Sequence, residues 1–388
     1  MLRDLTLPAI TMGLLAAFVG YAASFAIVLA GLGAMGASPG QAATGLFFAT
    51  LGMGMGSMLL PAMTRIPAAV AWSTPGAAML AASAAPDGGF AVAVGAMLIC
   101  AAMIVITGFV PALGRLVAAI PKPVANALLA GVLLKLCFAP AVALGSVPLL
   151  VLPVLMAWLA GLCWHRLAAM PCAVAAFAAV MAFGVDLGGG AMTWQLPALV
   201  SVMPVFDPAA MVSLALPLFL VTMAGQNVPG FAVLDLNGYT VPRAALLRGT
   251  GGLSLLIAPF GAVPVNMSAI TAAIMAGEDA GRDPSRRYWA AIVSGLAYVA
   301  LALAAGSVAA IAARAPADLI TAVAGLALIP ALVGSLSGAF ADRAQPEAPA
   351  LTFLIAASGM GLWGVSGAFW AVVAGVTVWV ARAAVRRG

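Results

Sequence analysis

The chain has 388 residues, of which 65% are hydrophobic and only 7% are charged. A soluble domain carries about 25% charged residues, and a soluble fold of this size could not hide so much apolar surface. This composition excludes a water-soluble globular protein. Apolar runs near the length of a bilayer crossing recur along the chain without the alternation of barrel strands, so we predict an all-α polytopic membrane protein in a lipid bilayer.

The net charge of +5 does not indicate a nucleic-acid partner. The basic residues stand singly or in pairs between apolar runs, where they would orient membrane segments. The four cysteines lie inside apolar runs without a CxxC spacing, and the chain has no zinc, haem or phosphate-loop motif. The sequence therefore predicts no cofactor and no metal.

Fourteen transmembrane segments are predicted, in two sets of seven separated by a polar stretch around residues 186–207. The first set is expected at residues 8–32, 41–61, 74–85, 89–112, 123–140, 147–164 and 168–185. The second set is expected at residues 208–235, 243–258, 266–277, 286–313, 317–340, 347–364 and 367–383. The halves of the chain are thus residues 1–197 and 198–388.

The basic residues support this division, because they alternate between the ends of successive segments. With the N-terminus in the cytoplasm, all of the 16 lysines and arginines except Arg314 and Lys135 fall on the cytoplasmic side. The pattern holds only when the two short segments, 74–85 and 266–277, count as crossings. Seven crossings per half give the halves opposite orientation, so we predict a 7+7 inverted repeat with both termini cytoplasmic.

An extended stretch precedes each short segment. Pro67 disfavours helix before the first, and Pro259, Gly261 and Pro264 do so before the second. We expect Thr74 and Asn266 to act as N-caps of the helices that follow. Paired interrupted segments in inverted repeats indicate the binding site of a transporter, because irregular backbone at membrane depth must face protein or a water-filled cavity.

The N-termini of the two short helices should face one another near the membrane midplane. Each carries about half a positive charge and unpaired N–H groups, so together they suit a small carboxylate without any lysine or arginine. The substrate-binding candidates flank the two breaks or lie on neighbouring helices. They are Tyr21, Ser73, Thr74, Gln226, Asn227, Asn266, Ser268 and Thr271.

Several side chains have an alternative role. Gln226 and Asn227 either contact the ligand or satisfy the broken backbone, since burying an unpaired amide costs roughly 2–7 kcal/mol. The serines at positions 73 and 268 are open to the same two roles. Tyr21 is either a cavity aromatic or an ordinary helix contact. Lys135, within a helix, either extends to the outer interface or faces the cavity.

No acidic residue is predicted at the membrane centre, because all 11 aspartates and glutamates fall in loops or at helix ends. The serines of the short segments have no accessible histidine, so an intramembrane enzyme would lack its nucleophile–base pair. We therefore predict no catalytic residues. A coupled proton would travel with the substrate or through water.

Four motifs stand in order along the chain. They are Ala71–Ala78 (AWSTPGAA), Gly225–Ala232 (GQNVPGFA), Ala258–Gly261 (APFG) with Asn266–Ala273 (NMSAITAA), and Asp283–Tyr288 (DPSRRY). Together they resemble the benzoate/proton symporter (BenE) family over essentially the whole chain. That family is related in fold to the uracil and nucleobase transporters.

The resemblance implies a core domain of predicted helices 1–4 and 8–11 and a gate domain of helices 5–7 and 12–14. The substrate would lie between short strands preceding half-helices 3 and 10. Uracil-type relatives place acidic residues on helices 8 and 10, where this chain offers Gln226 and only neutral residues. An anionic substrate explains this departure, because a carboxylate would repel it. Fold relatives often form homodimers through the gate domain, and the resemblance extends that expectation to this chain.

The leading prediction is a secondary active transporter in the bacterial inner (cytoplasmic) membrane. It would import benzoate or a similar small aromatic carboxylate together with a proton. The alternatives are a transporter of another small anion or of a neutral nucleobase, and more distantly a passive channel. A channel needs a continuous polar pore, whereas the polar residues here cluster at the helix breaks.

Overall fold

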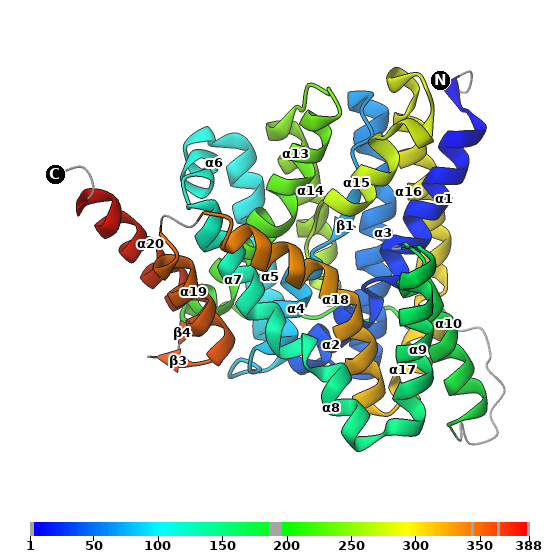
Figure 1. The fold of residues 1–388 in the computed structure, drawn as a ribbon. Coiled ribbons are helices and arrows are strands. Elements are labelled where there is room, and N and C mark those ends of the chain that lie inside the picture. Colours follow the sequence, from blue (N-terminus) through cyan, green and yellow to red (C-terminus); the bar gives the residue numbers. More distant parts are fainter. Residues whose placement is uncertain (1–3, 166, 186–195, 343–344, 363–364, 386–388) are drawn as a thin grey trace.

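The computed structural model describes residues 4–165, 167–185, 196–342, 345–362 and 365–385, and most of them are helical (Figure 1). The elements of the N-terminal half are α1 (Leu7–Ala22), α2 (Phe25–Ala34), α3 (Pro39–Thr64), β1 (Val70–Trp72), α4 (Thr74–Ala82), α5 (Phe90–Phe109), α6 (Pro111–Ala118), α7 (Lys122–Cys137), α8 (Ala139–Ser146), α9 (Pro148–Trp164) and α10 (Ala169–Phe183).

The C-terminal half contains two π-helical segments, η2 and η3, and three short 3-10 helices, η4, η5 and η6. Its elements are α11 (Pro208–Ala210), η2 (Met211–Ala215), α12 (Leu216–Thr222), η3 (Met223–Asn227), α13 (Val228–Leu236), α14 (Arg243–Ile257), η4 (Ala258–Phe260), β2 (Val265–Met267), α15 (Ala269–Ala276), η5 (Glu278–Ala280), η6 (Pro284–Arg286), α16 (Tyr288–Leu303), α17 (Ala305–Arg314), α18 (Ala317–Ala339), α19 (Glu347–Ser358), β3 (Gly361–Leu362), β4 (Val365–Ser366) and α20 (Gly367–Val385).

Six helices in the described residues are long and apolar enough to cross a bilayer. A seventh span results if α16 and α17, which are bent by 53° relative to each other, are taken together. Four further apolar helices are shorter, at 10–17 residues. The six are Leu7–Ala34, Pro39–Thr64, Phe90–Phe109, Lys122–Ser146, Pro208–Leu236 and Ala317–Ala339. The prediction of a multi-helical membrane protein is therefore confirmed at the level of helix content and apolarity.

Each predicted apolar segment contains a helix, but several segments are interrupted. The first breaks at Ala23 and Ser24, between α1 and α2. The segment predicted to end at residue 364 ends at Ser358, because Gly359 takes a left-handed φ of 64° that stops the helix. The short helix α6, which begins at Pro111, was not predicted. It follows a break at Val110, whose extended backbone separates it from α5.

Helices of the N-terminal half pair with helices of the C-terminal half, so the two halves do not form separate bundles. Helix α3 packs on α16, α5 on α14, and α7 on α18. Small residues permit the α3–α16 approach, since a Cβ added to Gly295 would lie 2.7 Å from the carbonyl oxygen of Gly54. In a bilayer such close backbone packing replaces the hydrophobic effect as a source of helix association.

Strands β1 and β2 meet in the interior, where β1 packs on α3 and β2 packs on α14. They pair antiparallel, with Val70 opposite Met267, Ala71 opposite Asn266 and Trp72 opposite Val265. Because the strands run in opposite directions, the helices that follow them also run apart. Figure 1 shows α15 leading from the strand pair toward the end of the molecule that carries the N-terminus, and α4 leading away from it.

Candidate functional site

The strand pair is held at both outer edges by a buried serine. The backbone N–H of Val70 donates to Ser57 Oγ at 3.0 Å, and that hydroxyl donates back to the carbonyl of Val70 at 3.2 Å. Ser254 does the same for Val265, at 2.9 and 3.0 Å. Each serine satisfies backbone groups that a two-stranded sheet leaves unpaired, so extended backbone is stable inside the protein.

The helices that follow the strands are capped by serines, which corrects two predictions. Ser73, not Thr74, caps α4, and its Oγ accepts from the N–H of Gly76 at 3.1 Å. Ser268, not Asn266, caps α15, and its Oγ accepts from the N–H of Thr271 at 3.4 Å. Strand pairing explains the shift for Asn266, because it keeps the chain extended through Met267 and the second helix can begin only afterwards.

The first backbone N–H groups of the two helices stay unpaired. Within the described residues, the N–H groups of Thr74, Ala269 and Ile270 donate to no acceptor. Pro75 has no N–H, so α4 offers fewer donors than α15. These donors and the helix dipoles make the ends suitable for an oxygen atom of a ligand.

Asn266 is the predicted site residue with the greatest unmet hydrogen-bonding capacity. Its side chain is fully buried, and neither Nδ2 nor Oδ1 has a partner within the described residues. It lies directly opposite Ala71, so the two side chains stand on the same face of the strand pair. A buried amide without partners is rare in proteins and requires an explanation such as a ligand.

The two amides of the π-helical segment η3 have different roles. Asn227 is fully buried, and its Oδ1 accepts from the backbone N–H of Met267 at 3.0 Å. It therefore satisfies the interrupted backbone of β2, one of the two roles left open by the sequence. Gln226 is half-buried, and its side chain makes no hydrogen bond within the described residues. Wide turns of this kind are often found at functional sites.

Thr222 was not predicted as part of this region. It is fully buried at the end of α12, and its Oγ1 shares a hydrogen bond of 2.7 Å with Ser73 Oγ. The bond joins the capped end of α4 to the helix that carries Gln226 and Asn227. A threonine in an apolar run gives no distinct sequence signal, because its hydroxyl usually bonds to its own helix.

Tyr21 and Thr271 complete the set of predicted residues. The ring of Tyr21 lies 5.4 Å from that of Trp72, and Trp72 Nε1 donates to Ser24 Oγ at 2.7 Å. Strand alternation places Trp72 on the face of the strand pair opposite Asn266. The hydroxyls of Tyr21 and Thr271 are buried and have no partner within the described residues.

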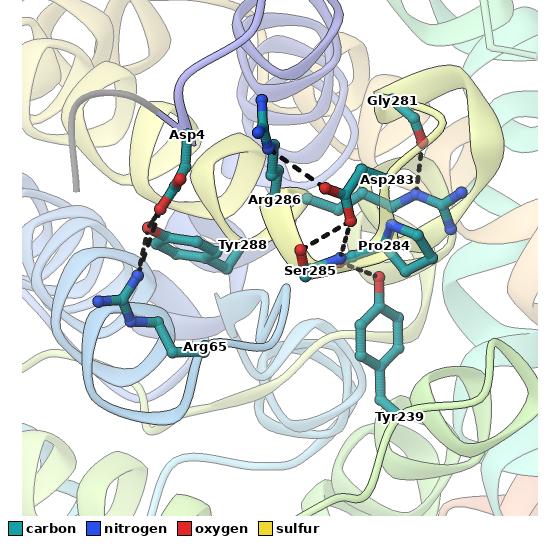
Figure 2. A network of polar contacts seen from close by, with 10 residues as sticks. Asp4, Arg65, Tyr239, Gly281, Asp283, Pro284, Ser285, Arg286 and Tyr288 are labelled. Atoms are coloured by element: carbon teal, nitrogen blue, oxygen red, sulfur yellow. Dashed lines mark hydrogen bonds and ion pairs between the residues drawn. The ribbon is translucent and has the colours of Figure 1, made fainter.

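The Asp283–Tyr288 motif does not lie at the strand pair. Figure 2 shows that Tyr288 faces Asp4 and Arg65. The Tyr288 hydroxyl donates to Asp4 Oδ2 at 2.9 Å and accepts from Arg65 Nη1 at 2.7 Å. The Arg65 guanidinium also lies 5.0 Å from the centre of the Tyr288 ring. This network ties the start of the chain to the end of α3 and the start of α16.

The same motif also fixes the end of α15. The buried Arg287 donates from Nη1 to the carbonyl of Ala276 and from Nε to the carbonyl of Gly281, both at 2.7 Å. A cation at a helix C-terminus is favoured by the helix dipole. Beside it, hydrogen bonds from the Ser285 side chain and backbone lower the pKa of the Asp283 carboxyl (Figure 2). The motif thus supports α15 from the end remote from Asn266.

A family model described as "Benzoate membrane transport protein" (BenE) matches residues 3–381. The chain belongs to the BenE family. The predicted resemblance is therefore confirmed, and the protein is a member of a membrane transport family.

Two known proteins are similar to this BenE-family chain in sequence, and one solved structure is similar to it in fold. "Inner membrane protein YdcO" of Escherichia coli (strain K12) is 35% identical over 376 residues, covering 96% of this chain and 95% of that protein. "Benzoate membrane transport protein" of Acinetobacter baylyi (strain ATCC 33305 / BD413 / ADP1) is 29% identical over 377 residues, with the same coverage. The transmembrane domain of the cyanobacterial bicarbonate transporter BicA shares the fold. It has a TM-score of 0.60 and 16% identity over 96% of this chain and 98% of that one.

Proposed function

We propose that this BenE-family protein imports benzoate or a similar small aromatic carboxylate together with a proton. The observation that carries the proposal is the meeting of two capped half-helices at β1 and β2, with the unpartnered amide of Asn266 between them. The relative from Acinetobacter baylyi is named as a benzoate transport protein, which supports the substrate class. The name of the Escherichia coli relative supports placement in the inner membrane, and the positive-inside pattern favours cytoplasmic termini.

An inverted repeat of residues 1–197 and 198–388, with seven crossings each, accounts for the packing. Exchanging each helix for its counterpart turns the α3–α16 pair into α14–α5, and the α2–α4 pair into α13–α15, and all four pairs are in contact. Ser57 and Ser254 hold β1 and β2 in the same way. Fourteen crossings follow if the strand and half-helix together form one crossing in each repeat.

Import would result from movement of one domain against the other. The packing supports a core domain of α1–α5 and α11–α17 and a gate domain of α7–α10 and α18–α20, because most close pairs fall within one of these groups. The strand pair belongs to the core domain, and η3 also reaches α7 of the gate domain. A site at this boundary would open to one side of the membrane at a time.

Thermal unfolding of the purified protein with benzoate, uracil or acetate tests the substrate class. A ligand that binds only the folded state at 100 times its dissociation constant stabilises it by about 2.7 kcal/mol. We expect benzoate alone to raise the melting temperature substantially. The acetate and uracil arms represent the rival functions, another small anion and a nucleobase, and stabilisation by either one instead of benzoate contradicts the proposal.

Uptake into proteoliposomes tests the coupling and the site. Benzoate accumulation in excess of that in protein-free liposomes should follow an imposed pH gradient with the acidic side outside, and protein-dependent uptake that ignores the gradient contradicts proton coupling. The Gln226→Ala, Asn266→Ala double variant should lose most of this uptake. Full uptake by that variant would show that the site lies elsewhere.

A further inference from the structure

The Asn266 side chain presents one donor and one acceptor next to each other. Its Nδ2 donates and its Oδ1 accepts, and both are buried without a partner within the described residues. Exchanging the two atoms by a flip of the amide leaves this property unchanged. A ligand that satisfies both atoms must itself offer an acceptor and a donor side by side.

The three forms of an aromatic ligand differ in this respect. A carboxylate offers two acceptors, so one of its oxygens would face Oδ1 with no proton between them. A protonated carboxylic acid offers a carbonyl acceptor and an O–H donor at the spacing of the amide. A primary carboxamide does the same with N–H as the donor. The amide of Asn266 therefore matches the acid and the carboxamide but not the carboxylate.

The partner position across the strand pair is apolar. Ala71 stands opposite Asn266 on the same face and ends in a methyl group. An apolar ring beside Ala71 and a carboxyl group at Asn266 fit a molecule with one apolar and one polar end. The free N–H groups of Thr74, Ala269 and Ile270 suit the carbonyl oxygen of an acid as well as a carboxylate oxygen.

The protein groups that could carry a proton lie away from Asn266. The elements packed against β2 are β1, η3, α3, α13 and α14. Within the described residues, their carboxylates and cations are all exposed at helix ends or in the first turns of α14. They are Arg65, Asp235, Arg243 and Arg248.

We infer that the site binds the uncharged carboxylic acid, and that the coupled proton crosses the membrane on the carboxyl group of the substrate. This inference rests on the proposed function and names the form of its substrate. The carboxylate takes up one proton on the outer side, the acid binds with its O–H donating to Oδ1 and its carbonyl accepting from Nδ2, and the proton dissociates again inside. One proton then moves with each substrate, and no side chain changes its protonation state.

Equilibrium binding to the purified full-length protein between pH 5.5 and 7.5 provides the first test. Carboxyl groups have pKa values of about 4, so the acid fraction falls about tenfold for each pH unit in this range. The apparent dissociation constant for total benzoate should therefore rise about 100-fold from pH 5.5 to 7.5. Benzamide should compete with an affinity that does not change with pH, and benzenesulfonate, a permanent anion, should not compete.

The outcomes separate this inference from the proposed function. If benzoate binds equally at both pH values and benzenesulfonate competes, the aromatic anion is the ligand and the inference is wrong, although the substrate class stands. If none of the three compounds binds at any pH, the substrate class fails and the inference fails with it. A steep pH dependence for benzoate together with constant benzamide binding supports both.

Substitution of Asn266 tests whether this residue binds the acid and the carboxamide. Asn266→Leu keeps the branching at Cγ but removes the donor and the acceptor, and it should weaken the binding of both benzoate at pH 5.5 and benzamide at least tenfold. Asn237→Ala, an exposed asparagine at the end of α13, should bind both as the unmodified protein does. Unchanged affinity in folded Asn266→Leu overturns the assignment. If that variant fails to fold, the ligand series on the unmodified protein still decides.

Discussion

Asn227 is the residue on which the extended backbone of β2 depends most directly. Its Oδ1 accepts from the buried N–H of Met267 at 3.0 Å. Replacement by leucine leaves that N–H unsatisfied, which costs about 1–3 kcal/mol. We expect Asn227→Leu to lower the thermal stability of the purified protein. Asn237→Ala removes only an exposed hydrogen bond to the Val233 carbonyl and should change the stability much less. Equal melting temperatures for the two variants would contradict this role.

The residues at the two helix breaks show what the sequence can and cannot predict. The polar positions at the two breaks were identified because Pro67, Pro259 and Pro264 interrupt long apolar runs. Which of them cap helices was not predictable, since the N-cap position depends on how far the pairing of β1 and β2 extends. The paired residues are almost 200 positions apart in the chain, so the local sequence does not show that Ser73 rather than Thr74, or Ser268 rather than Asn266, is the N-cap.

At the scale of elements, a hydrogen bond between two hydroxyls links half-helix α4 to the helix that carries η3. Ser73 Oγ both caps α4 and bonds to Thr222 Oγ1. Ser73→Ala should therefore destabilise the protein more than Thr222→Val, since loss of an N-cap alone costs about 1 kcal/mol. In a double-mutant cycle measured by thermal or denaturant unfolding, contacting residues couple by about 0.5–3 kcal/mol. Strict additivity would mean that the two hydroxyls do not interact.

The approach of α3 to α16 depends on two glycines. A Cβ added to Gly295 would lie 2.7 Å from the Gly54 carbonyl oxygen, so the helices must separate to accept it. Gly295→Ala should lower stability by about 1–3 kcal/mol, the usual cost of overpacking. Gly33→Ala is the matched control in α2, because no atom lies within 4 Å of its added Cβ. It should be neutral or stabilising, and a similar loss from both substitutions would contradict the packing argument.

The type and order of the elements were predictable because each helix has its own local signal in the sequence, an apolar run with basic residues at one end. Each predicted segment contains a helix, and the alternation of basic residues predicts the two short helices along with the long ones. The π-helical turns and the breaks at Ser24 and Ala304 were not predictable. They depend on contacts with other helices, which override the local preference of an apolar sequence for a regular α-helix.

At the scale of the whole molecule, the candidate site is built from neutral groups, which suits an uncharged ligand. Its irregular backbone is satisfied by neutral hydroxyls and amides from Ser57, Ser254 and Asn227. In the described residues, the carboxylates lie at helix ends or in loops. A neutral complex can pass the membrane interior without the cost of moving a bare charge through it. The same arrangement explains why a helix break, rather than an acidic residue, marks the candidate site in the sequence.

Movement of the proposed domains can be tested where they meet. A Cβ added to Gly225 in η3 would lie 3.3 Å from Cδ2 of Leu129 on α7, which joins the proposed core and gate domains. We would introduce Gly225→Cys and Leu129→Cys together, after replacing the four native cysteines. A short bifunctional thiol reagent should abolish benzoate uptake into proteoliposomes, and reduction should restore it if the reagent forms reducible links. Because a side chain at Gly225 also approaches Pro75 of α4, benzoate binding and uptake by the untreated double variant must first match those of the protein that lacks the native cysteines.

Two controls make this result specific to a link between the domains. Each single-cysteine variant treated with the same reagent should retain its uptake, which separates cross-linking from simple modification. Cross-linking of the double variant must also be verified by mass spectrometry. Full uptake by protein that is shown to be cross-linked would exclude relative movement at this contact. Transport would then have to proceed by rearrangement within one of the two helix groups, for example at the 53° bend between α16 and α17.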